Sequence, residues 1–150
     1  MKTLDIDWAD LEIAFRDGGC ESHLDTLRGE VLSIVPGFDD ERDLRERLAR
    51  QPERYVRIVP VDTPWSTAVV HRFVARQRGA LREELVAAMS GAGALSRALG
   101  VLRDHKAAWA SFARFEQAEL LRHIEAFLHA HGLQSHEAAP GLELFEGVTE

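Results

Sequence analysis

The stretch from residue 91 to residue 133 decides the fold, and it opens with GAGALSR at residues 91–97. Two glycines separated by one alanine favour a tight turn, because glycine adopts positive φ at little cost. Further on, apolar residues recur at helical spacing from Ala107 to His131, and Gly132 is typical of a helix C-cap. We therefore expect a turn, a short helix and then the longest helix of the chain.

The apolar residues of this long helix share one stripe, which should pack against the rest of the domain. They are Trp109, Phe112, Ala113, Leu120, Ile124, Phe127 and Leu128. Phe115 falls off the stripe, so we expect the helix to contact neighbours on two sides. Glu116 is the one carboxylate within the stripe, and we interpret it as an ion-paired or solvent-reaching side chain rather than a catalytic acid.

Upstream, β-branched residues and turn signals predict a small antiparallel sheet. Residues 23–25 and 30–35 form a hairpin, in which Gly29 takes positive φ at the turn. Residues 55–59 form a third strand, which ends where Pro60 has no amide donor for the ladder.

Helices flank this predicted sheet in the sequence. Asp7 caps a first helix, for which we expect Gly18 and Gly19 to supply a left-handed C-cap. The charge-dense stretch 38–50 predicts a short surface helix, with its arginines towards the C-terminal end, where they suit the helix dipole. Asp62 or Thr63 caps the helix that follows the third strand, and Gly79 interrupts it.

These elements predict an α+β fold. We expect a small three-stranded antiparallel sheet with helices packed mainly on one face, and a C-terminal helical half. Residues 1–133 form a single domain in this interpretation, and residues 134–150 form a polar tail that frays. Leu142, Leu144 and Phe145 are the side chains in the tail that are able to dock it.

Composition limits the function. The 150 residues carry a net charge of −7, which argues against a broad phosphate-binding surface. A single cysteine, Cys20, makes no internal disulfide and favours a reducing compartment. The chain shows no signal peptide and no apolar run long enough to span a bilayer, so we expect a cytoplasmic protein.

Several segments, in their order and spacing, resemble the bacterial uncharacterised protein family 0158. The matching segments are residues 24–31 (LDTLRGEV), 54–62 (RYVRIVPVD), 81–85 (LREEL), 91–97 (GAGALSR), Phe127-Leu128 and Gly132-Leu133. The resemblance covers most of the chain up to Leu133. It implies a fold and a bacterial origin, and it implies no reaction.

One segment departs from the family pattern. Members of the family typically carry an aromatic and basic run after the second glycine of the turn. Here Leu95, Ser96, Ala98 and Leu99 stand in that place, and only Arg97 keeps a charge.

No catalytic constellation is evident, so we expect a protein that is not an enzyme and holds no cofactor or metal. Cys20 has no His signature nearby, and Gly91-x-Gly93 lacks the strand and the Lys-Ser/Thr of a phosphate loop. Glu119 and His123 are four residues apart, as are Glu125 and His129, so a helix could bring either pair to one face. We interpret those histidines as favourable partners of the helix dipole rather than metal ligands.

Two function hypotheses remain. The first is a non-enzymatic module that binds a protein partner, or itself, through the helical half. The second is a nucleic-acid-associated factor that uses an arginine groove, although Glu83 and Glu84 would weaken such binding. The candidate binding residues are Arg72, Arg76, Arg82, Arg97, Trp109 and Phe115, with Arg78 as a further member of the groove.

Overall fold

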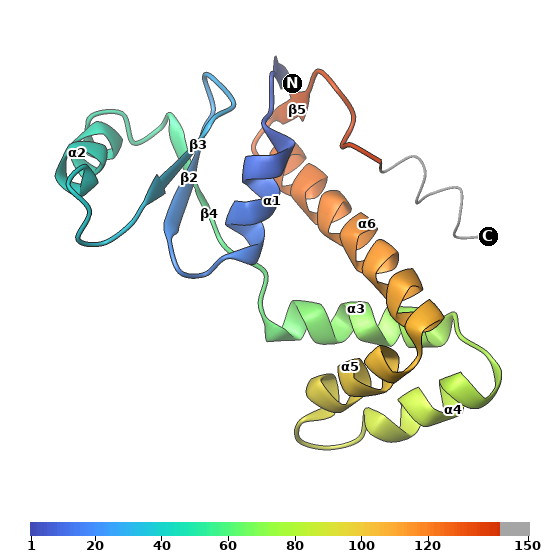
Figure 1. Ribbon diagram of the computed structural model, residues 1–150. Coiled ribbons are helices and arrows are strands. Elements are labelled where there is room, and N and C mark those ends of the chain that lie inside the picture. The colour runs from blue at the N-terminus through green and yellow to red at the C-terminus, as the bar shows by residue number, and fades with distance from the viewer. Residues whose placement is uncertain (142–150) are drawn as a thin grey trace. The chain divides into compact units, whose positions relative to one another are not determined.

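The computed structural model describes residues 1–141, so the expected docking of Leu142, Leu144 and Phe145 lies outside the described residues. The described chain divides into two compact units, an N-terminal unit of residues 1–61 joined by the chain from Leu120 onward, and a helical unit of residues 62–119. Figure 1 labels the elements. They are β1 (Lys2–Leu4), α1 (Trp8–Arg16), β2 (Glu21–Asp25), β3 (Val31–Ile34), α2 (Glu41–Arg50), β4 (Tyr55–Ile58), α3 (Thr63–Ala75), α4 (Gly79–Ala88), α5 (Ala94–Asp104), α6 (Lys106–Ala130) and β5 (Leu133–Ser135).

The N-terminal unit contains the predicted three-stranded antiparallel sheet, in the order β3-β2-β4. Ser22 pairs with Ser33 on one side and Ile58 on the other, so these three side chains share a face. Gly29 closes the β2–β3 turn with φ +77°, as predicted. A Cβ at Gly29 would lie 2.1 Å from the carbonyl oxygen of Asp5, so this turn admits no side chain.

Helix α1 packs against β3 and carries the aromatic core of this unit. The carboxylate of Asp7 caps the helix by accepting a hydrogen bond from the Asp10 amide at 3.1 Å. Trp8, Leu11 and Phe15 are buried, as their spacing predicted. The ring of Phe15 meets the rings of His123 and Phe127 from α6 edge-on.

The predicted glycine C-cap of α1 is wrong. The helix ends at Asp17, which is extended, and neither Gly18 nor Gly19 has positive φ. The carboxylate of Asp17 instead accepts a hydrogen bond from the Gly19 amide at 2.7 Å. A side-chain acceptor therefore makes this turn, where we expected a left-handed backbone.

A short parallel pair, β1 with β5, joins the two ends of the N-terminal unit. Lys2 pairs with Leu133 and Leu4 with Ser135, and Leu4 and Leu133 are both buried. Residues 133–135, at the boundary of the expected fraying tail, are thus a strand, and Ala139 beyond it is buried. Gly132 has positive φ, as expected of a residue that follows a helix.

The helical unit forms its core from α3, α4, α5 and the first half of α6. The buried residues of this core are Val69, Val70, Phe73, Val74, Leu85, Ala98, Leu102 and Phe112. Asp62 caps α3, accepting from the Trp65 amide at 3.0 Å. Gly91 and Gly93 both have positive φ, so the predicted tight turn between α4 and α5 is confirmed.

The α+β class, the three-stranded antiparallel sheet and the helical C-terminal half are confirmed. Within residues 1–141, none of the helices combines the length and the apolar character needed to cross a membrane.

Candidate functional site

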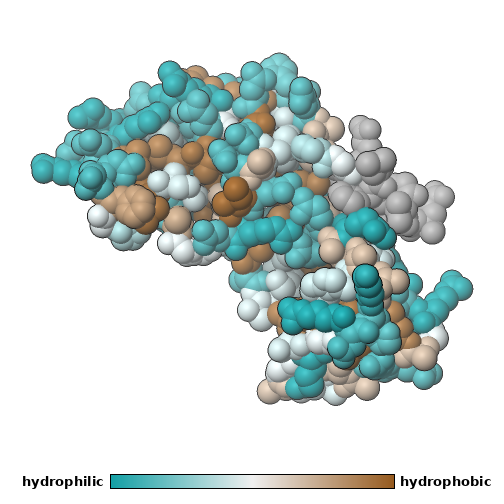
Figure 2. Space-filling view, viewed as in Figure 1, coloured by the Kyte–Doolittle hydropathy of each residue, from teal (hydrophilic) through white to brown (hydrophobic). Residues whose placement is uncertain are grey.

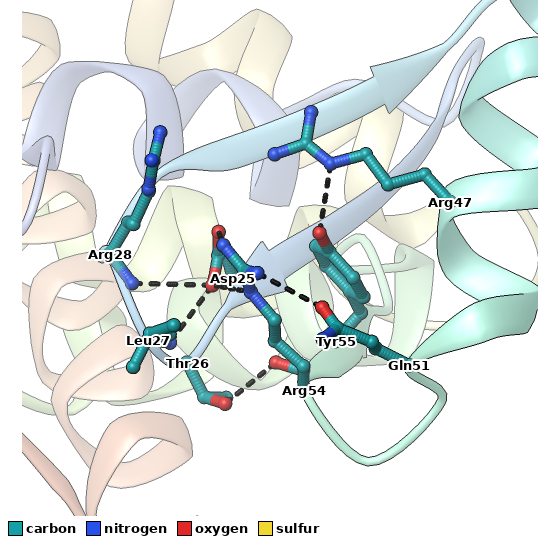
Figure 3. A network of polar contacts seen from close by, with 8 residues as sticks. All are labelled: Asp25, Thr26, Leu27, Arg28, Arg47, Gln51, Arg54 and Tyr55. Carbon is teal, nitrogen blue, oxygen red and sulfur yellow. Dashed lines mark hydrogen bonds and ion pairs between the residues drawn. The ribbon is translucent and has the colours of Figure 1, made fainter.

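A buried ion pair joins the hairpin turn to the start of β4 (Figure 3). Arg54 donates two hydrogen bonds to the carboxylate of Asp25, from Nε to Oδ1 at 2.9 Å and from Nη2 to Oδ2 at 2.7 Å. The amides of Leu27 and Arg28 donate to the same Oδ1 at 2.9 and 3.2 Å. Both oxygens of this carboxylate are therefore occupied from within the unit.

The electrostatics of this pair follow from its contacts. Asp25 is 2% exposed. Its hydrogen bonds from Arg54 outweigh the effect of burial and, with the turn amides, lower the pKa of the Asp25 carboxyl to about 2. The carboxylate is thus ionised at every physiological pH, and we assign it a structural role in holding the turn on β4.

Tyr55 lies beside this pair and connects it to α2. Arg47 of α2 donates from Nε to the Tyr55 hydroxyl at 2.9 Å (Figure 3). The guanidinium carbons of Arg47 and Arg54 lie 5.9 and 5.4 Å from the centroid of the tyrosine ring. This ring therefore fixes the last turn of α2 over the sheet.

Glu21 faces α2 from the other end of the sheet. Its carboxylate lies 2.9 Å from His23, 3.3 Å from Arg57 and 3.4 Å from Arg45. The hydrogen bond with His23, followed by the two nearby arginines, lowers the pKa of the Glu21 carboxyl. Arg45 also lies 4.0 Å from the carboxylate of Glu41, so the two arginines here are matched by two carboxylates.

Helix α2 itself is only partly covered. None of its ten residues is buried, and Leu44 and Leu48 are half-buried. Phe38, just before the helix, is 64% exposed. Figure 2 shows apolar surface between polar side chains in the region where Figure 1 places α2 and the sheet. Isolated helices of this length are marginal in water, so α2 depends on the few contacts it makes.

Two open pockets adjoin α2. One, of about 370 Å³, is lined by His23, Arg45, Leu48, Ala49, Pro52 and Tyr55. The other, of about 530 Å³, is lined by Phe38, Asp39, Glu41, Arg42, Arg45, Glu46 and Ala49. Arg45 and Ala49 line both pockets. We call the residues that line the two pockets the α2 surface.

The predicted arginine groove contains side chains that already have partners within the helical unit. Arg72 pairs with Glu119 of α6 at 3.2 Å. The guanidinium of Arg76 lies 4.9 Å from the centroid of the Phe115 ring. Arg97 donates to the backbone carbonyls of Ala88, Ser90 and Ala92 at the end of α4. These contacts explain the arginines as structural residues, whatever else they bind.

The remaining candidates are Arg82, Phe115 and Trp109. Arg82 lines an open pocket on α4 together with Arg78 and Glu83. Phe115 is half-buried against Phe73 in the helical core. Trp109, which we placed on the buried stripe, is 36% exposed, and the guanidinium of Arg103 covers its ring at 5.2 Å.

The fold places the candidate metal ligands and nucleophiles of residues 1–141 as follows. Within residues 1–141, no group of three or more His, Cys, Asp or Glu side chains lies close enough together to hold a metal ion. Cys20 is a free, half-buried thiol beside a pocket of about 160 Å³ that includes Ser22 and Ser33 in its lining. The two serine hydroxyls hydrogen-bond each other at 3.1 Å.

Sequence reasoning missed both carboxylate–arginine arrangements of the sheet. Asp25 and Arg54 stand 29 residues apart, so no local spacing connects them. A signal was nevertheless present, because an aspartate that opens a turn accepts amide hydrogen bonds, and Arg54 directly precedes the strand that pairs with β2. The register Asp25 with Tyr55 brings the two together.

Comparison of the chain with models of protein families, with curated proteins and with solved structures finds no match. The expected membership in family 0158 therefore stays a prediction.

Proposed function

We propose that the protein is a non-enzymatic interaction module that binds a protein partner through the α2 surface. The observation that carries this proposal is the exposure of α2, a helix of ten residues with none of them buried. In globular proteins most helical stability comes from packing of an amphipathic face. Here Leu44 and Leu48 are half-buried, and Phe38, which precedes the helix, is 64% exposed.

The chemistry of the α2 surface supports a protein partner. Phe38 supplies an aromatic anchor, and Arg42 and Arg45 supply planar guanidinium groups beside it. Aromatic residues and arginine are enriched at protein interfaces and among their energetic hot spots. Our proposal thus moves the binding surface from the helical half, where we expected it, to α2.

The alternative, a nucleic-acid-associated factor, has weaker support. Arg72, Arg76 and Arg97 have partners within the helical unit, and the chain carries a net charge of −7. Phosphate binding draws its affinity from cationic side chains that are able to replace counterions. We therefore propose, at most, weak and salt-sensitive binding to nucleic acids.

The experiment that tests this proposal is affinity capture by the full-length protein from a lysate of the source cells, with and without nuclease. Phe38→Ser removes the exposed aromatic ring, and Val59→Ser is the matched control, because Val59 is 69% exposed and lies outside the α2 surface. We expect a protein that the natural chain and Val59→Ser retain and Phe38→Ser loses, with no effect of nuclease.

Two results would contradict the proposal. One is capture that depends on nucleic acid. The other is equal retention by Phe38→Ser and by the natural chain, provided that all three proteins have the same melting temperature.

A further inference from the structure

The three-stranded sheet of the N-terminal unit has two outer strands, β3 and β4, which flank β2. An outer strand carries backbone amides and carbonyls that face away from the sheet and are able to pair with a further strand. Charged side chains and proline protect such edges in natural proteins. β4 contains Arg57, and Pro60 lies two residues beyond its end. β3, which reads VLSI over residues 31–34, has neither kind of protection.

The hairpin turn determines which backbone groups of β3 face outward. The Asp25 amide donates to the Glu30 carbonyl at 2.8 Å, so these two residues are a hydrogen-bonded pair of the β2–β3 ladder. Hydrogen-bonded and non-hydrogen-bonded pairs alternate along an antiparallel ladder. The amides and carbonyls of Val31 and Ser33 therefore point away from β2. Among the backbone hydrogen bonds that join different elements of residues 1–141, none involves Val31 or Ser33.

The side chains along this edge are partly uncovered. Ile13 of α1 is 62% exposed, although it is a large aliphatic residue. It lines a pocket of about 160 Å³ together with Val31 and Ser33 of β3. Val31 is half-buried and Ser33 is exposed. A strand added beside β3 covers apolar surface here as well as pairing the free backbone groups.

The two ends of β3 carry opposite charges. Arg28 precedes the strand, and Asp39 and Asp40 follow it. All three are exposed, and none of them takes part in the ion pairs of residues 1–141. Antiparallel pairing of two copies of β3 brings the start of one strand to the end of the other, so unlike charges approach at both ends. The same pairing of two β4 strands brings two Arg57 side chains together, which like-charge repulsion opposes.

We propose that β3 pairs, antiparallel, with β3 of a second copy of this chain, so that the two sheets continue into one. Val31 of each copy lies opposite Ser33 of the other, and their outward amides and carbonyls form the hydrogen bonds of the new ladder. Arg28 of each copy lies near Asp40 of the other. The interface belongs to the small, transient class, because it buries one short edge and its flanking side chains. The inference does not rest on the proposed function, since it uses the edge of the sheet rather than the α2 surface.

Sedimentation equilibrium of the full-length protein, from about 10 µM to about 1 mM, measures this self-association. We expect a monomer–dimer equilibrium. Ser33→Lys brings two like charges close together across the two-fold axis, so the dissociation constant should rise roughly fivefold or more. Val59→Lys is the matched control, because it adds the same charge at a position 69% exposed, just beyond β4. It should leave the dissociation constant within about twofold.

A charge exchange at the ends of β3 separates pairing from any loss of folding. Arg28→Glu and Asp40→Arg each place like charges at both ends of the pair, so each variant alone should dimerise less than the natural chain. An equal mixture of the two variants restores unlike charges at both ends of a mixed dimer. We therefore expect the mixture to dimerise as the natural chain does, a recovery that a folding defect in either variant does not produce.

A natural chain that stays monomeric up to about 1 mM would overturn the inference, since transient dimers of proteins form in that range. Equal weakening by Ser33→Lys and Val59→Lys would also overturn it, and so would a mixture of Arg28→Glu and Asp40→Arg that remains as monomeric as each variant alone. If the chain is monomeric while Phe38→Ser still abolishes partner capture, this inference fails and the proposed function stands.

Discussion

The helical unit and helix α2 both present arginines on helices, but the two regions use them differently. In the helical unit, Arg97 donates to three backbone carbonyls at the end of α4, and the helices there enclose a core around Phe73. On α2, the ion pairs of Arg45 with the described residues are long, at 3.4 and 4.0 Å, and no residue of the helix is buried. An arginine-rich sequence is therefore not by itself a binding surface, because each guanidinium is available to a ligand only to the extent that the fold leaves its donors without partners.

The two regions should differ most in the stability that their packing provides. Phe73 is 2% exposed and meets the rings of Phe112 and Phe115, so Phe73→Ala should lower the free energy of unfolding by about 3–5 kcal/mol. Leu48→Ala on half-buried α2 should cost about 1 kcal/mol, because little apolar area is lost. Chemical denaturation of both variants measures this contrast. Equal losses of unfolding free energy in the two variants would show that α2 is packed as tightly as the core of the helical unit.

The Asp25–Arg54 ion pair should make the stability of the fold depend on pH. The pKa of Asp25 falls from 3.8 to about 2 on folding, so the ionised carboxylate stabilises the fold above pH 3.8 and this contribution disappears as the pH falls through about 2. Its size at neutral pH is about 2 kcal/mol, from the free energy that corresponds to such a shift.

Urea denaturation between pH 7 and pH 2 measures this contribution. The natural chain should lose more stability over that range than Asp25→Asn, which lacks the carboxylate. Parallel pH profiles for the two proteins would show that the Asp25–Arg54 pair contributes nothing to stability.

A smaller effect distinguishes the two kinds of arginine. Arg97→Ala should cost about 1 kcal/mol, because carbonyls at the end of α4 lose their donor. Arg45→Ala should cost about 0–1 kcal/mol, the usual range for an exposed ion pair. Thermal unfolding of the two variants checks the order. A larger loss for Arg45→Ala would show that Arg45 is committed to the fold and is not available to a partner.

Much of the fold could be predicted because its signals are local. Asp7 and Asp62 cap their helices, and Gly29, Gly91 and Gly93 take the positive φ that their turns need. The parallel pairing of β1 with β5 could not be predicted, since each strand has three residues and they lie at opposite ends of the described chain. The end of α1 was missed for a different reason, because the Asp17 carboxylate replaced the left-handed glycine that the sequence favoured.

The candidate site was less predictable than the fold. The six residues chosen from the sequence all lie in the helical unit, because arginine and aromatic residues are conspicuous there. The α2 surface depends instead on which residues remain uncovered after folding. The sequence predicted a short surface helix over residues 38–50, and the exposure of Phe38 and the long contacts of Arg45 emerged only in three dimensions.

Photo-crosslinking in living source cells tests directly whether a protein partner binds the α2 surface rather than the helical unit. A photoreactive amino acid is placed at Ala49, which lines both pockets of the α2 surface, or at Ser111, an exposed position of the helical unit two residues from Trp109. We predict a discrete protein adduct from position 49, lost on adding Arg45→Glu and retained on adding Arg50→Glu, and none from position 111. An adduct from position 111 alone would contradict the account and return the binding surface to the helical unit.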